Sequence, residues 1–298
     1  MNKKIVVIVG PTASGKTSLS IKIAKQFNGE VISADSRQVY RGMDLGSGKV
    51  TQDEMAGIPH HLLDVADPMD VYTASDFVRD ATASIDDIVN RGNLPIVAGG
   101  TFFYVDSLLN RYSLPEVPPN PKLRSELETK TTDELFSVLE KKDPNRAKTI
   151  DKHNSRRLIR SLEIIDALGL VPKPTRNDSS YNACLFGVDI KQETLRQNIH
   201  NRILERLDQG MVKEVENLIK KGVTHERLED LGLEYRFISR YLRKKISYDE
   251  MIIQLDTKIC QFAKRQMTWL KRDTDIIWID PKDTENIFTT TQKFLADE

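Results

Sequence analysis

The strongest constraint on this chain is a short glycine-rich segment close to the N-terminus. The segment Gly10-Pro-Thr-Ala-Ser-Gly-Lys16-Thr17 has the pattern G-x-x-x-x-G-K-[ST]. It follows the apolar run IVVIV, which is typical of a buried parallel strand, and it precedes apolar residues at helical spacing. A strand, such a loop and a helix in this order form a phosphate-binding loop. The pattern predicts a bound phosphate chain and leaves open what that chain is attached to.

The chemistry of this loop follows from its residue types. Backbone N–H groups of residues 12–17 gather at a helix start, where the helix dipole favours phosphate oxygens. Lys16 adds a positive charge, and the Thr17 hydroxyl is suited to bind Mg²⁺. The predicted phosphate site consists of Gly10, Pro11, Thr12, Ala13, Ser14, Gly15, Lys16 and Thr17.

Segments typical of strands and helices alternate along the first hundred residues. EVISADS and NLPIVAGGT are typical of short strands, and FFYVDSLL is typical of a helix. This alternation predicts an α/β fold, with a doubly wound parallel sheet as in the P-loop NTPases. Ligands of such sheets bind beyond the carboxyl ends of the strands. We therefore expect Gly10, Asp35 and Thr101, which each follow a strand, to line one crevice.

Two proline-rich segments divide the chain. SLPEVPPNPKLR is typical of a linker, and VPKPTRNDSSYN closes a stretch that shows only helical periodicity. We expect a helical insertion at residues 114–182 within an α/β catalytic core formed by residues 1–113 and 183–298. In the second part of the core we expect strands at CLFGVDI and DIIWID. Helices are expected at residues 191–221, 233–242 and 247–271.

Composition and charge narrow the class of protein. The chain has 39% apolar and 30% charged residues, as in soluble globular proteins. Its net charge of zero conceals basic regions at residues 140–176 and 236–272, which favour a polyanionic partner. The N-terminal apolar run is too short for a signal peptide or a membrane span, so we expect a cytoplasmic protein. Cys184 and Cys260 lack metal-ligand spacing, and we expect reduced thiols.

The chain lacks the second acidic strand that nucleotide-hydrolysing enzymes usually carry. PIVAGG ends in glycines, and IIWID lies at the far C-terminal end, so Asp35 is the best-placed carboxylate. Asp35 is suited to hold a metal, to accept a proton from a nucleophile, or to cap a helix after SADS. His60 and His61 are adjacent, so their side chains point apart, which favours a structural role over a metal site.

Several ordered blocks resemble one known family over nearly the whole chain. The blocks are GPTASGKT, ISADSRQVYRGMDLGSGKV, GIPHHLLDVADP with YTASDFVRDA, PIVAGGTFFYVDSLL, NSRRLIRSLEI and AKRQMTWLKR. They are similar to blocks of the bacterial tRNA dimethylallyltransferases, also called tRNA isopentenyltransferases. Two positions depart from that pattern. Glu234 stands in LGLEYR where the family often has Gly, and Arg156 stands where Gln is frequent.

The resemblance implies alkyl transfer from dimethylallyl diphosphate to N6 of adenosine 37 in tRNA, with release of diphosphate. The phosphate loop and Arg202 would then hold the diphosphate of this donor, together with Mg²⁺, in place of an NTP. Asp35 would accept the N6 proton. The implied catalytic residues are Asp35, Lys16 and Thr101.

The acceptor implied by the resemblance is the anticodon stem-loop, whose target adenine has to be flipped out of its stack. The helical insertion would be the tRNA-binding domain, and we expect the protein to act as a monomer with no membrane partner. The implied tRNA-binding residues are Asp35, Ser36, Arg37, Gln38, Thr101, Arg124, Arg156, Arg157 and Arg160.

Three other functions remain open at this point. They are an isopentenyltransferase that acts on a free adenine nucleotide, a small-molecule P-loop kinase that binds ATP, and an NTP-regulated RNA-binding module without chemistry. The large insertion and its arginines favour a macromolecular acceptor over a small one. The lack of a second acidic strand disfavours NTP turnover, and Asp35 favours chemistry over binding alone.

Overall fold

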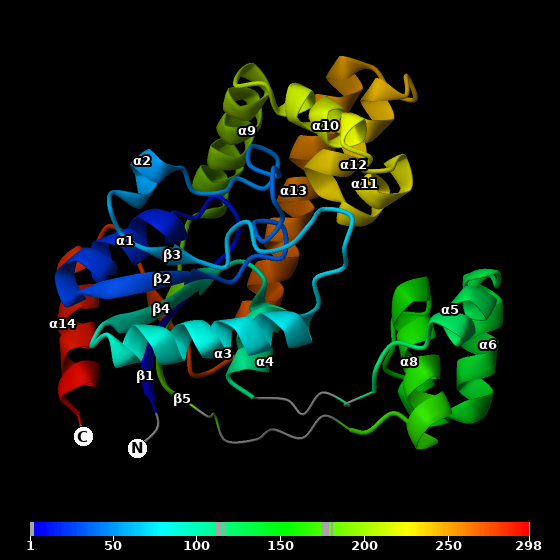
Figure 1. The fold of residues 1–298 in the computed structure, drawn as a ribbon, viewed down its shortest axis with the longest axis horizontal. Coiled ribbons are helices and arrows are strands. Elements are labelled where there is room, and N and C mark those ends of the chain that lie inside the picture. The colour runs from blue at the N-terminus through cyan, green and yellow to red at the C-terminus, as the bar shows by residue number, and fades with distance from the viewer. Residues whose placement is uncertain (1–2, 111–114, 116, 174–178, 180, 298) are drawn as a thin grey trace. The chain divides into compact units, whose positions relative to one another are not determined.

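The computed structural model describes residues 3–110, 115, 117–173, 179 and 181–297 (Figure 1). The chain divides into two units, residues 1–109 with 179–298, and residues 110–178. The insertion expected at residues 114–182 is offset from the second unit by four residues at each end. Its expected start lies outside the described residues. Its expected end falls inside a strand, because Tyr181 pairs with Lys3.

A six-stranded parallel sheet forms the centre of the first unit. Its strand order is β3-β2-β4-β1-β5-β6, and every pairing in it is parallel, which confirms the expected α/β fold. The strands are β1 Lys3–Val9, β2 Gly29–Ser33, β3 His60–His61, β4 Leu94–Gly99, β5 Tyr181–Val188 and β6 Ile277–Ile279.

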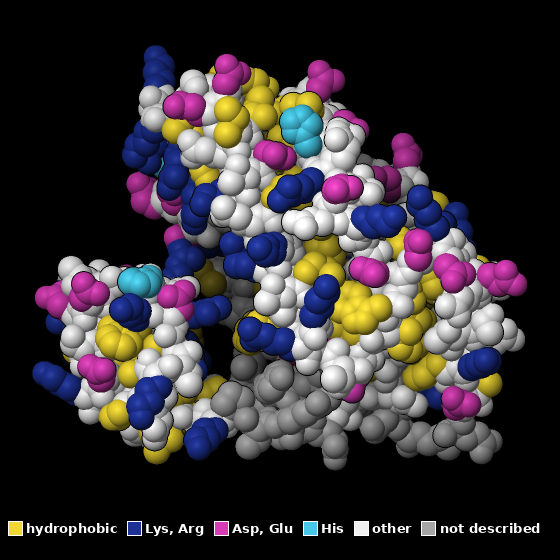
Figure 2. Space-filling model, turned by 180° about the vertical axis from the view of Figure 1, so that it is seen from behind, with side chains coloured by type: hydrophobic (Ala, Val, Ile, Leu, Met, Phe, Trp, Pro, Cys, Tyr) yellow, Lys and Arg dark blue, Asp and Glu magenta, His cyan; other side chains and the backbone are white. Residues whose placement is uncertain are grey.

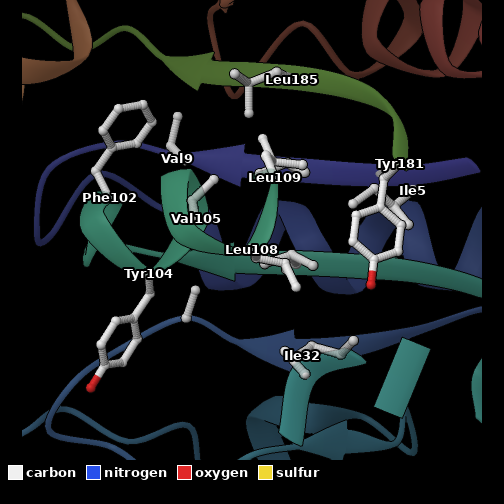
Figure 3. Close-up of a cluster of buried hydrophobic side chains, with 14 of the residues drawn as sticks. Ile5, Val9, Ile32, Phe102, Tyr104, Val105, Leu108, Leu109, Tyr181 and Leu185 are labelled. Carbon is white, nitrogen blue, oxygen red and sulfur yellow. The ribbon is translucent and has the colours of Figure 1, made fainter. Parts of the chain in front are cut away.

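Helices cover both faces of this sheet, because the central strands are apolar on both sides. Val6 and Ile8 pack with residues of α1 (Lys16–Phe27) and α14 (Thr284–Ala296). Ile5 and Val9 face the opposite way, toward α3 (Ala74–Asn90) and α4 (Phe102–Leu108). Figure 3 shows the second cluster, with Val105, Leu108 and Leu109 lying over the sheet. This two-sided burial is what a doubly wound sheet requires.

A layer of helices after β5 extends the first unit. It consists of α9 Gln192–Asp208, α10 Met211–Lys220, α11 His225–Leu231, α12 Leu233–Leu242 and α13 Tyr248–Leu270. The short α2 Gln52–Met55 lies between β2 and β3 in the sequence. The single helix expected at residues 191–221 is wrong. Gly210 has φ of 100° and separates α9 from α10, a conformation that glycine adopts at little cost. Val39, Tyr40 and Met43 pack into the core of this helical layer.

The second unit is helical in its described part, as expected. It contains α5 Pro121–Glu128, α6 Thr132–Lys142, α7 Pro144–Ala147 and α8 Ser155–Leu168, which share a core of their own. Among all the described residues, no helix combines the length and the apolar character that a bilayer crossing requires.

The adjacent histidines form β3 and point apart. His61 Nε2 lies 2.7 Å from Glu30 Oε2, and this buried carboxylate also accepts hydrogen bonds from Arg91 and Asn93. The Arg91 hydrogen bonds lower the pKa of Glu30 to about 2. His60 Nδ1 lies 2.9 Å from the carbonyl oxygen of Ile58. No cluster of three metal-binding side chains occurs in the described residues, and both histidines have structural contacts.

Candidate active site

A cavity of about 380 Å³ lies beyond the carboxyl ends of β1, β2 and β4. It is lined by the phosphate loop, the turn after β2, the loop at residues 46–48, the turn after β4, and residues of the helices α9, α11, α12 and α13. Asp35 and Thr101 line the cavity as expected, but Gly10 does not. Gly10 lies underneath, where an added Cβ would be 3.0 Å from Ser14 Oγ and 3.2 Å from Val188 Cβ.

The phosphate loop keeps its helix start open. Within the described structure the N-cap Gly15 provides no side-chain hydrogen bond, so the N–H groups of the first turn of α1 remain available. Thr12 N–H donates to Gln266 Oε1 at 3.1 Å, and Lys16 Nζ donates to the Pro11 carbonyl at 2.6 Å. Ser14 Oγ is buried without a hydrogen-bonding partner among the described residues. Thr12, Ala13, Lys16 and Thr17 face the cavity.

The pKa of Lys16 depends on its burial, on its charged neighbours and on whether an anion is bound. Burial lowers its pKa to about 8, the Asp35 carboxylate opposes this shift, and the Arg202 guanidinium adds to it. A bound diphosphate favours the charged ammonium form, so binding raises the pKa of Lys16. Diphosphate binding therefore takes up a proton when the pH is above about 8.

The affinity of the protein for inorganic diphosphate is expected to fall as pH rises through the pKa of Lys16. The free protein loses the Lys16 proton above about pH 8, so the affinity drops roughly fivefold between pH 8 and pH 9. Titration calorimetry at several pH values measures this slope. A Lys16→Met variant should bind more weakly and lose this slope, keeping only the pH dependence that comes from the protonation of diphosphate itself. Equal slopes in the two proteins would show that Lys16 does not titrate there.

Asp35 caps a turn and keeps one carboxylate oxygen available. Its Oδ1 accepts from the N–H of Arg37 at 2.8 Å and of Gln38 at 3.4 Å. The helix considered after SADS is wrong, because residues 36–39 form turns. In the described structure Oδ2 has no hydrogen-bonding partner. Thr101 Oγ1 accepts from the Ser36 N–H at 3.0 Å and so ties the turns after β2 and β4 together.

Two of the expected recognition residues in this turn have internal partners. Arg37 Nε donates to the Leu231 carbonyl at 2.7 Å. Gln38 Nε2 donates to the Gly48 carbonyl at 3.1 Å, while its Oε1 accepts from Ser33 Oγ at 2.9 Å. Both side chains line the cavity and support its walls.

Opposite the phosphate loop, α9 and α12 bring three charged groups together. Arg202 and Arg206 are one helical turn apart on α9, and Glu234 lies in the first turn of α12. Arg206 Nη1 lies 3.9 Å from Glu234 Oε1. Burial and, secondly, the Arg206 charge lower the pKa of Arg202 to about 10, while burial raises the pKa of Glu234. Within the described residues neither guanidinium has a hydrogen-bonding partner, so both can receive an anionic ligand.

The loop at residues 46–48 is shaped by these same helices. A Cβ on Gly48, whose φ is 63°, would lie 1.8 Å from Arg206 Nη2. A Cβ on Gly46 would lie 2.6 Å from the ring of Tyr235. Only glycine at these positions lets the two side chains pack directly on the loop backbone.

Gln266 on α13 is a site residue that was not among the candidates predicted from the sequence. Its Nε2 donates to the Gly100 carbonyl at 2.7 Å, while its Oε1 accepts from Thr12 N–H. It therefore links the phosphate loop to the turn after β4. The signal that identifies it is its place within AKRQMTWLKR, one of the blocks that carry the family resemblance.

The four arginines expected to bind tRNA from the insertion divide into two pairs. Arg124 Nη2 donates to the buried Glu163 at 2.7 Å, and Arg160 Nη1 lies 3.5 Å from the same carboxylate. Arg160 Nη2 also donates to the Val117 carbonyl. Arg156 and Arg157 are exposed on α8. Arg124 and Arg160 therefore hold the insertion's own structure together.

A phosphate loop below a cationic cavity, with a strand-end carboxylate at its edge, defines a P-loop enzyme that transfers a group from a phosphorylated donor. The family model "IPP transferase" matches residues 38–273. The chain belongs to this family.

Relatives and solved structures agree with this membership. The chain is 41% identical over 271 residues to tRNA dimethylallyltransferase 2 of Shewanella sediminis, covering 91% of this chain and 90% of that protein. It is 44% identical over 273 residues to tRNA dimethylallyltransferase 2 of Treponema denticola, covering 90% and 91%.

The crystal structure of the tRNA isopentenylpyrophosphate transferase of Bacillus halodurans matches with a TM-score of 0.75 and 35% identity, over 99% of this chain and 97% of that one. The structure of a eukaryotic dimethylallyltransferase acting on tRNA matches with a TM-score of 0.78 and 28% identity, over 99% of this chain and 78% of that one.

Proposed function

We propose that this protein transfers a dimethylallyl group from dimethylallyl diphosphate to N6 of adenosine 37 in tRNA. The observation that carries the proposal is the similarity to tRNA dimethylallyltransferases over about nine tenths of both chains. The cavity supports it, because phosphate-binding groups and a carboxylate face the same space.

The donor's diphosphate is the leaving group. The N–H groups of the phosphate loop and Lys16 stabilise the charge that develops as the bond between the allylic carbon and oxygen breaks. Arg202 and Arg206 bind the diphosphate equally in the substrate and in the transition state, so they contribute to the affinity for the donor. Thr17 is exposed at the cavity, and the described residues contain no cluster of three side chains that could hold a metal by themselves. This donor set suits Mg²⁺ held largely by substrate oxygens and water, with Thr17 as its protein ligand. When bound, Mg²⁺ supplies further neutralisation of the diphosphate.

The acceptor nitrogen needs a base. The lone pair of N6 is delocalised into the adenine ring, so the amine is a weak nucleophile until its proton is accepted. As the bond from N6 to the allylic carbon forms, Asp35 Oδ2 takes the N6 proton, and diphosphate leaves with the electron pair. Thr101 keeps the Asp35 turn in place through Ser36 and presents its hydroxyl to the cavity.

The helical insertion is proposed as the tRNA-binding unit, with Arg156 and Arg157 as its phosphate contacts. Replacing both with alanine is expected to weaken tRNA binding and to lower the slope of log affinity against log salt by about one to two. Filter binding at several salt concentrations measures this slope. The control is Lys130→Ala with Lys141→Ala, two basic residues of the same unit. An unchanged slope in the Arg156 and Arg157 variant would remove them from the interface.

Ligand protection distinguishes the proposed donor from a nucleotide. Dimethylallyl diphosphate with Mg²⁺ is expected to raise the melting temperature more than ATP does at equal concentration. If ATP raised the melting temperature more than dimethylallyl diphosphate did, the result would argue against an isoprenoid donor and for a kinase. The cytoplasmic location and the monomeric state remain predictions of the sequence.

A further inference from the structure

The loop at residues 44–48 contributes Gly46, Ser47 and Gly48 to the cavity wall, and its first three residues form an anion-binding site. The backbone N–H groups of three consecutive residues, Asp44, Leu45 and Gly46, point at one carboxylate. Glu214 Oε2 accepts from Asp44 at 2.9 Å and from Leu45 at 2.6 Å, and Oε1 accepts from Gly46 at 3.0 Å. Successive N–H groups that converge in this way form a nest, which binds anions. Here the anion is a side chain of α10, about 170 residues further along the chain.

The same carboxylate is held from the other side. Tyr235, which is 1% exposed, donates its hydroxyl to Glu214 Oε1 at 3.0 Å. The Tyr235 ring also packs against Gly46. Glu214 therefore receives four hydrogen bonds, three from the loop and one from α12. This set of contacts fixes the N-terminal half of the loop against the helical layer.

The C-terminal half of the loop belongs to the cavity wall. Ser47 and Gly48 line the cavity, and the Arg206 guanidinium packs directly on Gly48. The Gly48 carbonyl accepts from Gln38, in the turn that Asp35 caps. A displacement of the loop therefore changes the surface on which Arg206 rests.

We propose that Glu214 is a positioning residue for the transfer reaction. Its carboxylate fills the nest at residues 44–46 and so fixes the wall on which Arg206 presents its guanidinium to the donor's diphosphate. The inference rests on the proposed function, because it assigns the diphosphate to Arg206. Glu214 does not line the cavity in the described structure, so its effect reaches the reaction through the loop.

Glu214→Ala is the direct test, because it leaves the nest empty. Misplacement of a binding group by about 1 Å costs on the order of 10²-fold, so the KM for dimethylallyl diphosphate should rise by about that factor. The kcat and the KM for tRNA should stay within about threefold. Acetate, added at constant ionic strength, should enter the empty nest and lower the KM of Glu214→Ala again. The control is Glu216→Ala, on the same helix and paired with Lys213, which should match the unaltered protein with or without acetate.

The rates of amide hydrogen exchange at residues 44–46 report whether the nest is filled, and they can be measured without any enzymatic turnover. The amides of Asp44, Leu45 and Gly46 should exchange faster in Glu214→Ala and regain protection when acetate is added. If the unaltered protein transfers nothing, the proposed function fails, and the exchange measurement with the affinity for inorganic diphosphate still decides the role of Glu214. An unchanged KM with protected amides overturns the inference. So does a raised KM that acetate leaves unchanged while the protein melts normally.

A second variant covers the case in which Glu214→Ala does not fold. Glu214→Gln keeps the size of the side chain but offers one acceptor oxygen in place of two. It should raise the KM for the donor by a smaller factor, without rescue by acetate, because no space is vacated. A donor KM equal to that of the unaltered protein in Glu214→Gln would overturn the inference.

Discussion

Replacing Asp35 with asparagine is expected to lower the transfer rate by about two to four orders of magnitude. An amide oxygen still accepts from the Arg37 N–H, so the turn that Asp35 caps keeps its hydrogen bond. An amide does not accept the N6 proton, so the chemical step loses its base. The variant thereby separates the capping role from the catalytic one, and single-turnover rates with tRNA and dimethylallyl diphosphate measure the difference.

Two comparisons sharpen the Asp35 experiment. Affinity for tRNA should stay unchanged, because binding does not depend on the proton transfer. Asp53→Asn, which changes an exposed carboxylate of α2, should transfer at the normal rate. If Asp35→Asn transfers as fast as the unaltered protein, Asp35 is a structural cap and another group accepts the proton.

The second large effect is expected from Gly48→Ala. The new methyl group would lie 1.8 Å from Arg206 Nη2, so the guanidinium has to leave its place. Loss of one charge-assisted contact to the diphosphate, together with the displaced loop, should raise the KM for dimethylallyl diphosphate on the order of 10²-fold. The kcat should change much less, because Asp35 keeps the hydrogen bonds that it accepts from the backbone N–H groups of Arg37 and Gln38.

Gly42→Ala is the matched control for Gly48→Ala. Gly42 also has a positive φ, of 72°, but the nearest atom to an added Cβ is 3.9 Å away. Both variants therefore carry backbone strain of about 1 kcal/mol, and only Gly48→Ala displaces Arg206. Equal donor KM values in the two variants would show that strain alone, and not the position of Arg206, governs donor binding.

The fold could be predicted largely from local patterns. Short apolar runs that end at turn-forming residues identified β1, β2 and β4, and their parallel order followed from the alternation with helices. α3 was missed, although Thr73 and Asp76 form a capping box and apolar residues follow at helical spacing. The break at Gly210 was also missed, because α9 and α10 continue one apolar pattern on both sides of it.

The site could be predicted only in part, because much of it depends on contacts between distant parts of the chain. Asp35 and Thr101 follow strands, so their meeting at one edge was predictable from the sheet, whereas Gly10 also follows a strand but does not line the cavity. Arg206 on Gly48 and Glu214 on residues 44–46 join positions far apart in sequence. No local pattern marks such pairs. For the arginines of the insertion, the sequence shows that they are basic but not which partners they have. It did not reveal that Arg124 and Arg160 contact the buried Glu163.

The most direct test of this account is to incubate unmodified tRNA with labelled dimethylallyl diphosphate, Mg²⁺ and the protein, and to digest the product to nucleosides. The account predicts label on N6 of the adenosine at position 37, with one diphosphate released for each group transferred. Label on free AMP or ATP but none on tRNA, or release of diphosphate without any transfer, would contradict it.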